Sequence, residues 1–141
     1  MNESNEQNER ERMPEIHIAR LNNDKTRRVD GSETVYNVYF ELSATPPQSW
    51  ETLFEGEWKL INVAHPDLWQ AAHVDRNFLV LRSALDQVVP MHLPFLKQAV
   101  AATNVRYAQY EGIVAQERAE RQMTWERERS DVEAMAKTVT L

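Results

Sequence analysis

The chain has 141 residues, of which 22 are acidic and 16 are basic, so its formal net charge is −6. This length allows one folded domain with a tail, and a hydrophobic content of 42% is enough for a buried core. Because the chain has no cysteine, disulfides, thiolate nucleophiles, cysteine-ligated zinc and iron–sulfur clusters are excluded. The acidic balance argues against broad binding to nucleic acids or anionic membranes.

The N-terminal part of the chain is typical of a polar tail followed by a β-hairpin. Residues 1–14 lack the apolar run of a signal or anchor, and we expect them to form a disordered acidic tail. Glu15–Leu21 and Thr34–Ala44 are expected to be strands, because apolar and polar residues alternate along them. The alternation is clearest in Thr34–Ala44. Turn signals at residues 22–24 and 30–31 separate these strands, so we expect them to pair. Residues 25–29 could extend the hairpin or remain a loop.

The segment Gln48–Leu60 predicts an amphipathic helix. Trp50, Leu53, Phe54 and Trp58 follow one another at helical spacing and form one apolar stripe. The prolines at positions 46 and 47 end the preceding strand, because neither can donate a ladder hydrogen bond.

Residues 65–85 predict a break and then a second hairpin. The break falls at residues 65–67, and Leu68–Val74 fits either a short strand or a helical turn. We favour a strand that pairs with the apolar run Phe78–Leu85 across a tight turn at residues 75–77. The two hairpins together give an antiparallel sheet of about four strands.

The C-terminal third of the chain is predicted to be helical. No proline occurs between Phe95 and Leu141, and the only glycine there is Gly112. Residues 94–115 keep an apolar spacing suited to packing on the sheet, whereas residues 116–141 are densely charged. Either one helix runs through the whole stretch, or the chain kinks near Gly112 and continues as a second helix.

The order ββαββα predicts an α+β fold, a two-layer sandwich with its helices on one face of the sheet. Residues 15–115 would form the α+β core domain, and residues 116–141 a charged C-terminal helical extension. A continuous helix of about 40 residues would be about 60 Å long. It would overrun such a core, so we expect the overhang to need a partner or to be mobile.

The densest group of potential metal ligands or acid–base residues is His65, Asp67, His73 and Asp75. A metal-assisted hydrolase would need such side chains to converge on one ion, but their spacing matches no helical ligand pair. We therefore favour the interpretation that His65 and His73 are structural surface residues. The chain also lacks nucleophile-elbow and phosphate-loop motifs, so we expect neither catalytic residues nor a cofactor.

Lys25, Arg27 and Arg28 form the only concentrated basic group outside the long helix. A basic hairpin loop can contact phosphates. These charges are few, however, and the neighbouring sequence offers no aromatic platform for bases. We favour a solvated hairpin tip over nucleic-acid binding.

The most informative residue of the charged helix is Trp125, because exposing an indole forgoes a large favourable burial term. Val132, Met135 or Ala136, and Val139 share its stripe, and Arg121 and Arg129 lie one turn to either side, able to cover the ring. Tryptophan, methionine and arginine are enriched in interface cores. We interpret the following residues as partner-binding: Met123, Trp125, Arg121, Arg129, Val132, Met135 and Val139. The stripe is not a continuous heptad, so a long coiled coil is not expected. Alternatively, the chain turns near Gly112 and packs Trp125 onto its own core.

These features favour a small non-enzymatic module whose C-terminal helix self-associates or docks into a larger complex. We expect a homo-oligomer in the cytoplasm, without membrane association. One alternative is a metal-assisted hydrolase using His65 and His73. A second alternative is an acidic inhibitor that occupies a basic site on another protein, because residues 1–89 carry the whole net charge of −6 and residues 90–141 are balanced.

Overall fold

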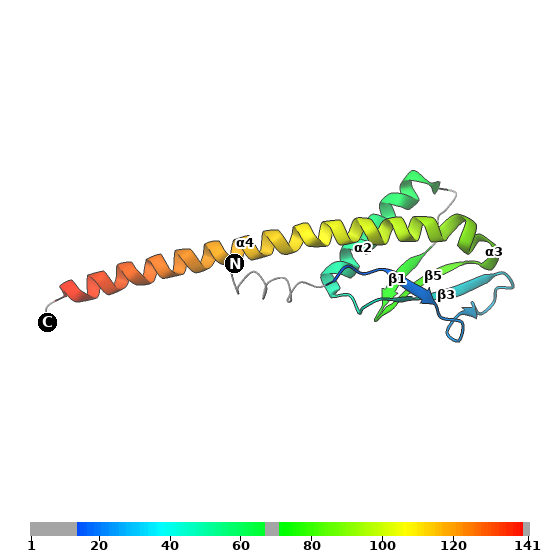
Figure 1. The fold of residues 1–141 in the computed structure, drawn as a ribbon, viewed down its shortest axis with the longest axis horizontal. Coiled ribbons are helices and arrows are strands. Elements are labelled where there is room, and N and C mark those ends of the chain that lie inside the picture. The colour runs from blue at the N-terminus through cyan, green and yellow to red at the C-terminus, as the bar shows by residue number, and fades with distance from the viewer. Residues whose placement is uncertain (1–13, 67–70, 140–141) are drawn as a thin grey trace, which may run out of the picture. The chain divides into compact units, whose positions relative to one another are not determined.

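The computed structural model describes residues 14–66 and 71–139 (Figure 1). The chain divides into a first unit, Met1–Arg106, and a second unit, Tyr107–Leu141. None of the described helices is long and apolar enough to cross a membrane.

The first unit contains an antiparallel sheet of five strands. In the sheet the order is β1–β3–β5–β4, and the two-residue β2 pairs with the same edge of β3 as β1 does. The strands are β1 (Ile18–Leu21), β2 (Arg27–Arg28), β3 (Val35–Leu42), β4 (Ala72–Asp75) and β5 (Phe78–Ala84). With the helices described below, this sheet confirms the predicted α+β class.

Both predicted hairpin pairings are present. β1 pairs with β3, with Leu21 opposite Phe40, and β2 lies in the stretch that the sequence left open between strand and loop. β4 pairs with β5, with Asp75 opposite Phe78 across the two-residue turn Arg76–Asn77, where Arg76 has a φ of +56°. The ambiguous segment Leu68–Val74 is therefore a strand from Ala72 onward, and residues 67–70 lie outside the described part of the chain.

One face of the sheet forms the core with the helices. Alternation along β3 buries Val38, Phe40 and Leu42, and Leu79 and Leu81 of β5 share this buried face. Figure 1 shows α2 (Gln48–Ala64) and the first turns of α4 (Leu93–Thr138) on one side of the sheet. This is the predicted two-layer arrangement.

Helix α2 is one turn longer than the predicted segment Gln48–Leu60. Its apolar stripe continues to Ile61. Asn62 is also buried, and its side-chain nitrogen donates a 3.0 Å hydrogen bond to the carbonyl of Trp58. The helix ends at Ala64, where the amide of His65 donates the last bond to Ile61 (2.9 Å). Pro66 disfavours helical geometry at the residue before it, which explains this end point.

A short helix, α3 (Leu85–Gln87), and a π-helical turn at Val88–His92 connect β5 to α4. The first turns of α4 bury Leu96, Ala99, Val100 and Thr103.

Asn104 ties α4 to two other parts of the first unit. Its side-chain oxygen accepts hydrogen bonds from the Ile16 amide (3.2 Å) and from Nε1 of Trp50 (3.0 Å), and its nitrogen donates to the Ile16 carbonyl (2.7 Å). Asn104 thereby fixes α4 to the segment before β1 and to the start of α2.

α4 is one helix from Leu93 to Thr138, so it passes Gly112 without a break and crosses the boundary between the units. The alternative in which the chain turns near Gly112 to bury Trp125 is therefore wrong. The first unit ends at Arg106, whereas the sequence placed the end of the core at residue 115. Tyr107, Tyr110 and Val114 continue the helical spacing, but spacing alone does not reveal which surface a stripe packs against.

Candidate functional site

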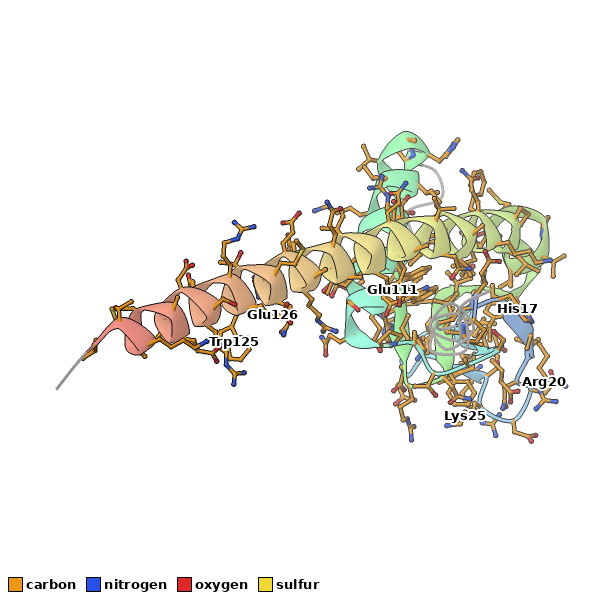
Figure 2. The ribbon with its side chains drawn as sticks, turned by 60° about the vertical axis from the view of Figure 1, so that its left-hand side comes forward. His17, Arg20, Lys25, Glu111, Trp125 and Glu126 are labelled. Carbon is orange, nitrogen blue, oxygen red and sulfur yellow. The ribbon has the colours of Figure 1, made fainter. Side chains whose placement is uncertain are left out.

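The candidate site is the surface of the second unit, where helix α4 is exposed residue after residue. Every residue from 115 to 139 is exposed. Trp125 has 53% of its surface exposed, and Val132, Met135 and Val139 are exposed to a similar degree. Figure 2 shows Trp125 on the orange part of α4. In the described structure these large apolar side chains remain exposed to water. The favourable free energy of burying them is therefore not realised.

Helical geometry gathers these side chains on one face. Residues three or four apart lie on the same side of an α-helix. The face that contains Trp125 is named here the Trp125 face, and it consists of Tyr110, Val114, Arg118, Arg121, Trp125, Glu128, Val132, Met135 and Val139. Six of these nine residues are apolar or aromatic, and three are charged. Arg129, four positions after Trp125 and over its ring, borders this face.

Met123 lies elsewhere on the helix. It is two positions from Trp125, and at 100° per residue this separation turns it to the opposite side. Its side chain is 60% exposed, about as much as that of Trp125. The sequence grouped it with the binding residues because it is close in the chain, not because it shares their face.

The charged neighbours of Trp125 are ordered by local contacts. The guanidinium carbon of Arg129 stands 5.3 Å from the centroid of the indole ring, and Nε of Arg129 lies 3.3 Å from Oε1 of Glu133. The predicted covering of the ring by an arginine thus occurs on the Arg129 side. Such an exposed cation–π contact is worth about 0.5–1 kcal/mol, and it leaves half of the indole uncovered.

A shallow depression of about 390 Å³ lies beside Trp125 on the same helix. It is lined by Glu117, Glu120, Arg121, Thr124, Trp125 and Glu128. A single helix forms all of its walls, and most of its lining is charged. Small-molecule sites are concave and mostly apolar, so this surface is better suited to a partner that lies along it.

The histidine cluster is spread over separate elements. His65 follows the C-terminus of α2 and packs against Phe95, with 4.7 Å between the ring centroids and 47° between the ring planes, whereas His73 and Asp75 belong to β4. Among residues 14–66 and 71–139, no group of three or more histidine and carboxylate side chains could hold a metal ion. Asp67 lies outside the described residues.

The predicted basic group is divided by the sheet. Arg27 is opposite Asn37 and Arg28 is opposite Tyr36, so these two side chains point to different faces. The expectation that no aromatic platform lies nearby is wrong, because Nζ of Lys25 stands 4.7 Å from the ring centroid of Phe78 and 5.7 Å from that of Tyr39. The rings come from distant strands, which local sequence could not reveal.

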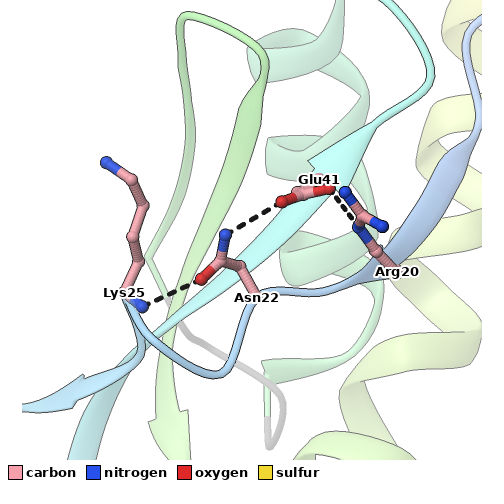
Figure 3. A network of polar contacts seen from close by, with 4 residues as sticks. All are labelled: Arg20, Asn22, Lys25 and Glu41. Carbon is pink, nitrogen blue, oxygen red and sulfur yellow. Dashed lines mark hydrogen bonds and ion pairs between the residues drawn. The ribbon is translucent and has the colours of Figure 1, made fainter.

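A polar network holds the turn that carries Lys25 (Figure 3). Glu41 accepts hydrogen bonds from Arg20 and, at 2.9 Å, from the side chain of Asn22, whose own oxygen accepts the Lys25 amide at 2.9 Å. The bond from Arg20, followed by that from Asn22, lowers the pKa of Glu41. The network therefore uses these side chains to fix the turn.

Two carboxylates of the acidic surface are also paired within the first unit. Glu57 of α2 forms an ion pair with Arg106, and Glu41 forms one with Arg20. Pairing neutralises part of the acidity that suggested an inhibitor of basic sites.

Comparison with known protein families, curated proteins and solved structures finds no match to this chain.

Proposed function

We propose that this protein is a non-enzymatic assembly module that self-associates through the Trp125 face of α4. The observation that carries the proposal is the exposure of Trp125 on an uninterrupted helix, with Val132 and Met135 exposed on the same face. A second helix packed along this face would remove all three side chains from water.

The energies favour such packing. Complete burial of a valine or methionine side chain stabilises by about 1.5–3 kcal/mol, and a tryptophan offers a still larger apolar area. The helix itself is supported by i,i+4 contacts, such as the Gln122–Glu126 hydrogen bond of 3.1 Å, which are worth about 0.2–0.5 kcal/mol each. Contacts of this size leave an isolated helix only marginally stable in water. A partner helix would therefore stabilise both helices.

The charge of the second unit favours another copy of this chain as the partner. Tyr107–Leu141 contains seven acidic and five basic residues. A helix with nearly equal numbers of positive and negative charges does not strongly repel its own copy. A helix whose charges were all of one sign would instead require a partner of opposite charge.

The other candidate functions have weaker support. A hydrolase would need His65 and His73 to share a third ligand, and an inhibitor would need carboxylates such as Glu57 to be free of arginine. Nucleic-acid binding would rest on a lysine that already covers two rings. The cytoplasmic location expected from the sequence stays a prediction.

Replacing Trp125 by alanine tests the proposal. We expect Trp125→Ala to raise the dissociation constant of self-association at least about tenfold, because each lost indole removes more than about 1.4 kcal/mol of interface energy. The measurement is sedimentation velocity over a concentration series, with circular dichroism as the check on folding.

Met123→Ala is the matched control, because it removes an equally exposed apolar side chain from the other side of the same helix. It should change the dissociation constant less than about threefold, which is under 1 kcal/mol. Equal effects of the two substitutions would argue against a specific Trp125 face.

A further inference from the structure

We propose that two copies of this chain pair with their α4 helices antiparallel, with the two Trp125 side chains meeting at the dyad. The inference rests on the proposed self-association and specifies the partner's direction and register. It follows from the positions of the polar residues on the Trp125 face.

The spacing of residues along the Trp125 face is nearly the same on the two sides of Trp125. Its members precede Trp125 at steps of 4, 3, 4 and 4 residues and follow it at steps of 3, 4, 3 and 4. When a second copy runs in the opposite direction, each side chain of the face therefore meets a member of the same set. The layers are Tyr110 against the partner's Val139, Val114 against the partner's Met135, Arg118 against the partner's Val132, Arg121 against the partner's Glu128, and Trp125 against the partner's Trp125.

The charged residues of the face decide the direction. In the antiparallel pair Arg121 approaches the partner's Glu128 and also the partner's Arg129, which lies over the indole and is paired with Glu133 of its own chain. The dyad repeats this layer on the other side of Trp125. In a parallel, in-register pair each arginine would meet its own copy, and so would Glu128. Like charges placed together at a desolvated contact are strongly disfavoured, so the parallel arrangement is the poorer one.

The remaining layers suit the same arrangement. Val114 and Met135 are apolar, and Tyr110 places its ring against the partner's Val139. Arg118 can lay its aliphatic stem along the partner's Val132 and keep its guanidinium in water. The paired stretch from Tyr110 to Val139 would be about 45 Å long at 1.5 Å per residue.

Charged side chains at the rim of the helix pair disfavour the antiparallel arrangement, but their contribution to its free energy is smaller. Glu117 would approach the partner's Asp131, a like-charged pair. Both side chains are exposed, so solvent and salt screen their repulsion. The central pair between Arg121 and the partner's Glu128 lies beside two indoles, where less water remains.

Charge reversal at the central pair tests the direction. We expect Glu128→Arg to raise the dimer dissociation constant at least about tenfold, because it leaves only positive charges in this layer, twice in one dimer. Arg121→Glu should weaken the dimer less, because the partner's Arg129 offsets part of the new repulsion. The double variant restores opposite charges and should return to within about threefold of the wild type. The matched control reverses Glu126 and Arg127 together, which lie off the Trp125 face, and should have little effect.

A double variant as weak as the single variants would overturn the antiparallel pair. If that dimer were still weakened by Trp125→Ala, the proposed self-association would survive with a different geometry. A wild-type chain that stays monomeric would instead overturn self-association itself, so the two failures are distinguishable.

Cysteine cross-linking gives a second readout that does not depend on charge. The chain contains no native cysteine, so a mixture of Val114→Cys and Met135→Cys chains has one thiol per chain. We expect the mixed disulfide to exceed either symmetric disulfide after mild oxidation. A predominance of Val114→Cys homodimers, or the absence of any cross-link, would contradict the antiparallel register.

Discussion

His92 is the residue of the first unit whose chemistry burial changes most clearly. Only 1% of its surface is exposed, and its Nδ1 lies 3.0 Å from Oγ of Ser83 on β5. Desolvation lowers the pKa of His92, and a hydrogen bond with the backbone of Gln87 opposes this effect without cancelling it. The imidazole is therefore neutral at pH 7 and acts as a core polar group that joins the π-helical turn to the sheet.

This depressed pKa predicts a pH dependence of stability. The unfolded chain binds a proton at its ordinary pKa of about 6.5 while the folded chain resists it, so the free energy of unfolding falls as the pH drops below about 6.5. The loss is complete once the pH passes below the folded pKa. Urea unfolding at several pH values between about 7 and 5 measures this slope, which His92→Asn should flatten because an amide can keep the bond to Ser83 without titrating.

Glu41 affects the free energy of unfolding in a different pH range from His92. Its pKa is lowered from 4.5, so its contribution is present above pH 4.5 and is lost as the pH falls through the lower, folded value. The two effects therefore do not overlap between pH 7 and 5. An identical slope for the wild type and His92→Asn in that range would contradict the assignment to His92.

Residue-level predictions from sequence were most reliable where they depended on local spacing. The arginine over the Trp125 ring follows from helical spacing alone. The exposure of Trp125 does not, because the sequence left open a turn near Gly112 that would bury it on the core. The rings beneath Lys25 could not be predicted, because Tyr39 and Phe78 lie on strands whose register is set by the whole sheet. The bond between His92 and Ser83 depends on a π-helical turn, for which the sequence has no clear signal.

At the scale of elements, periodicity predicted the long strands and α2 closely. The alternation along β3 and the stripe from Trp50 to Trp58 each report one buried face directly. β2 has two residues, too few for any period to be visible. Gly112 raised the alternative of two helices, but one glycine costs a helix only about 1 kcal/mol relative to alanine, and α4 continues through it.

Replacing glycine by alanine is expected to have opposite effects on stability at Gly112 and at Gly31. Neither glycine has an atom within 4 Å of an added Cβ, but Gly31 has a φ of +81° and Gly112 is helical. Gly112→Ala should stabilise α4 by about 0.5–1 kcal/mol, and Gly31→Ala should destabilise the first unit by about 1 kcal/mol. Thermal unfolding followed by circular dichroism measures both. A destabilising Gly112→Ala would indicate that this glycine makes a close contact in the assembled protein.

At the scale of the whole molecule, the net charge of −6 is divided between two units with different properties. The first unit has a buried core that includes Trp50, Phe54 and Leu96, and it pairs carboxylates such as Glu41 and Glu57 internally. The second unit has nearly balanced charges, exposed apolar side chains and a single helix. Its exposed face, rather than the acidity of the chain, is the feature that supports a function in assembly.

Sedimentation equilibrium of the wild-type chain tests self-association most directly. The monomer has a mass of 16.5 kDa. Across concentrations from micromolar to sub-millimolar, we expect the weight-average mass to rise toward twice that value, and Trp125→Ala to delay the rise. A mass that stays at 16.5 kDa throughout, with the helical signal intact, would contradict assembly through the Trp125 face.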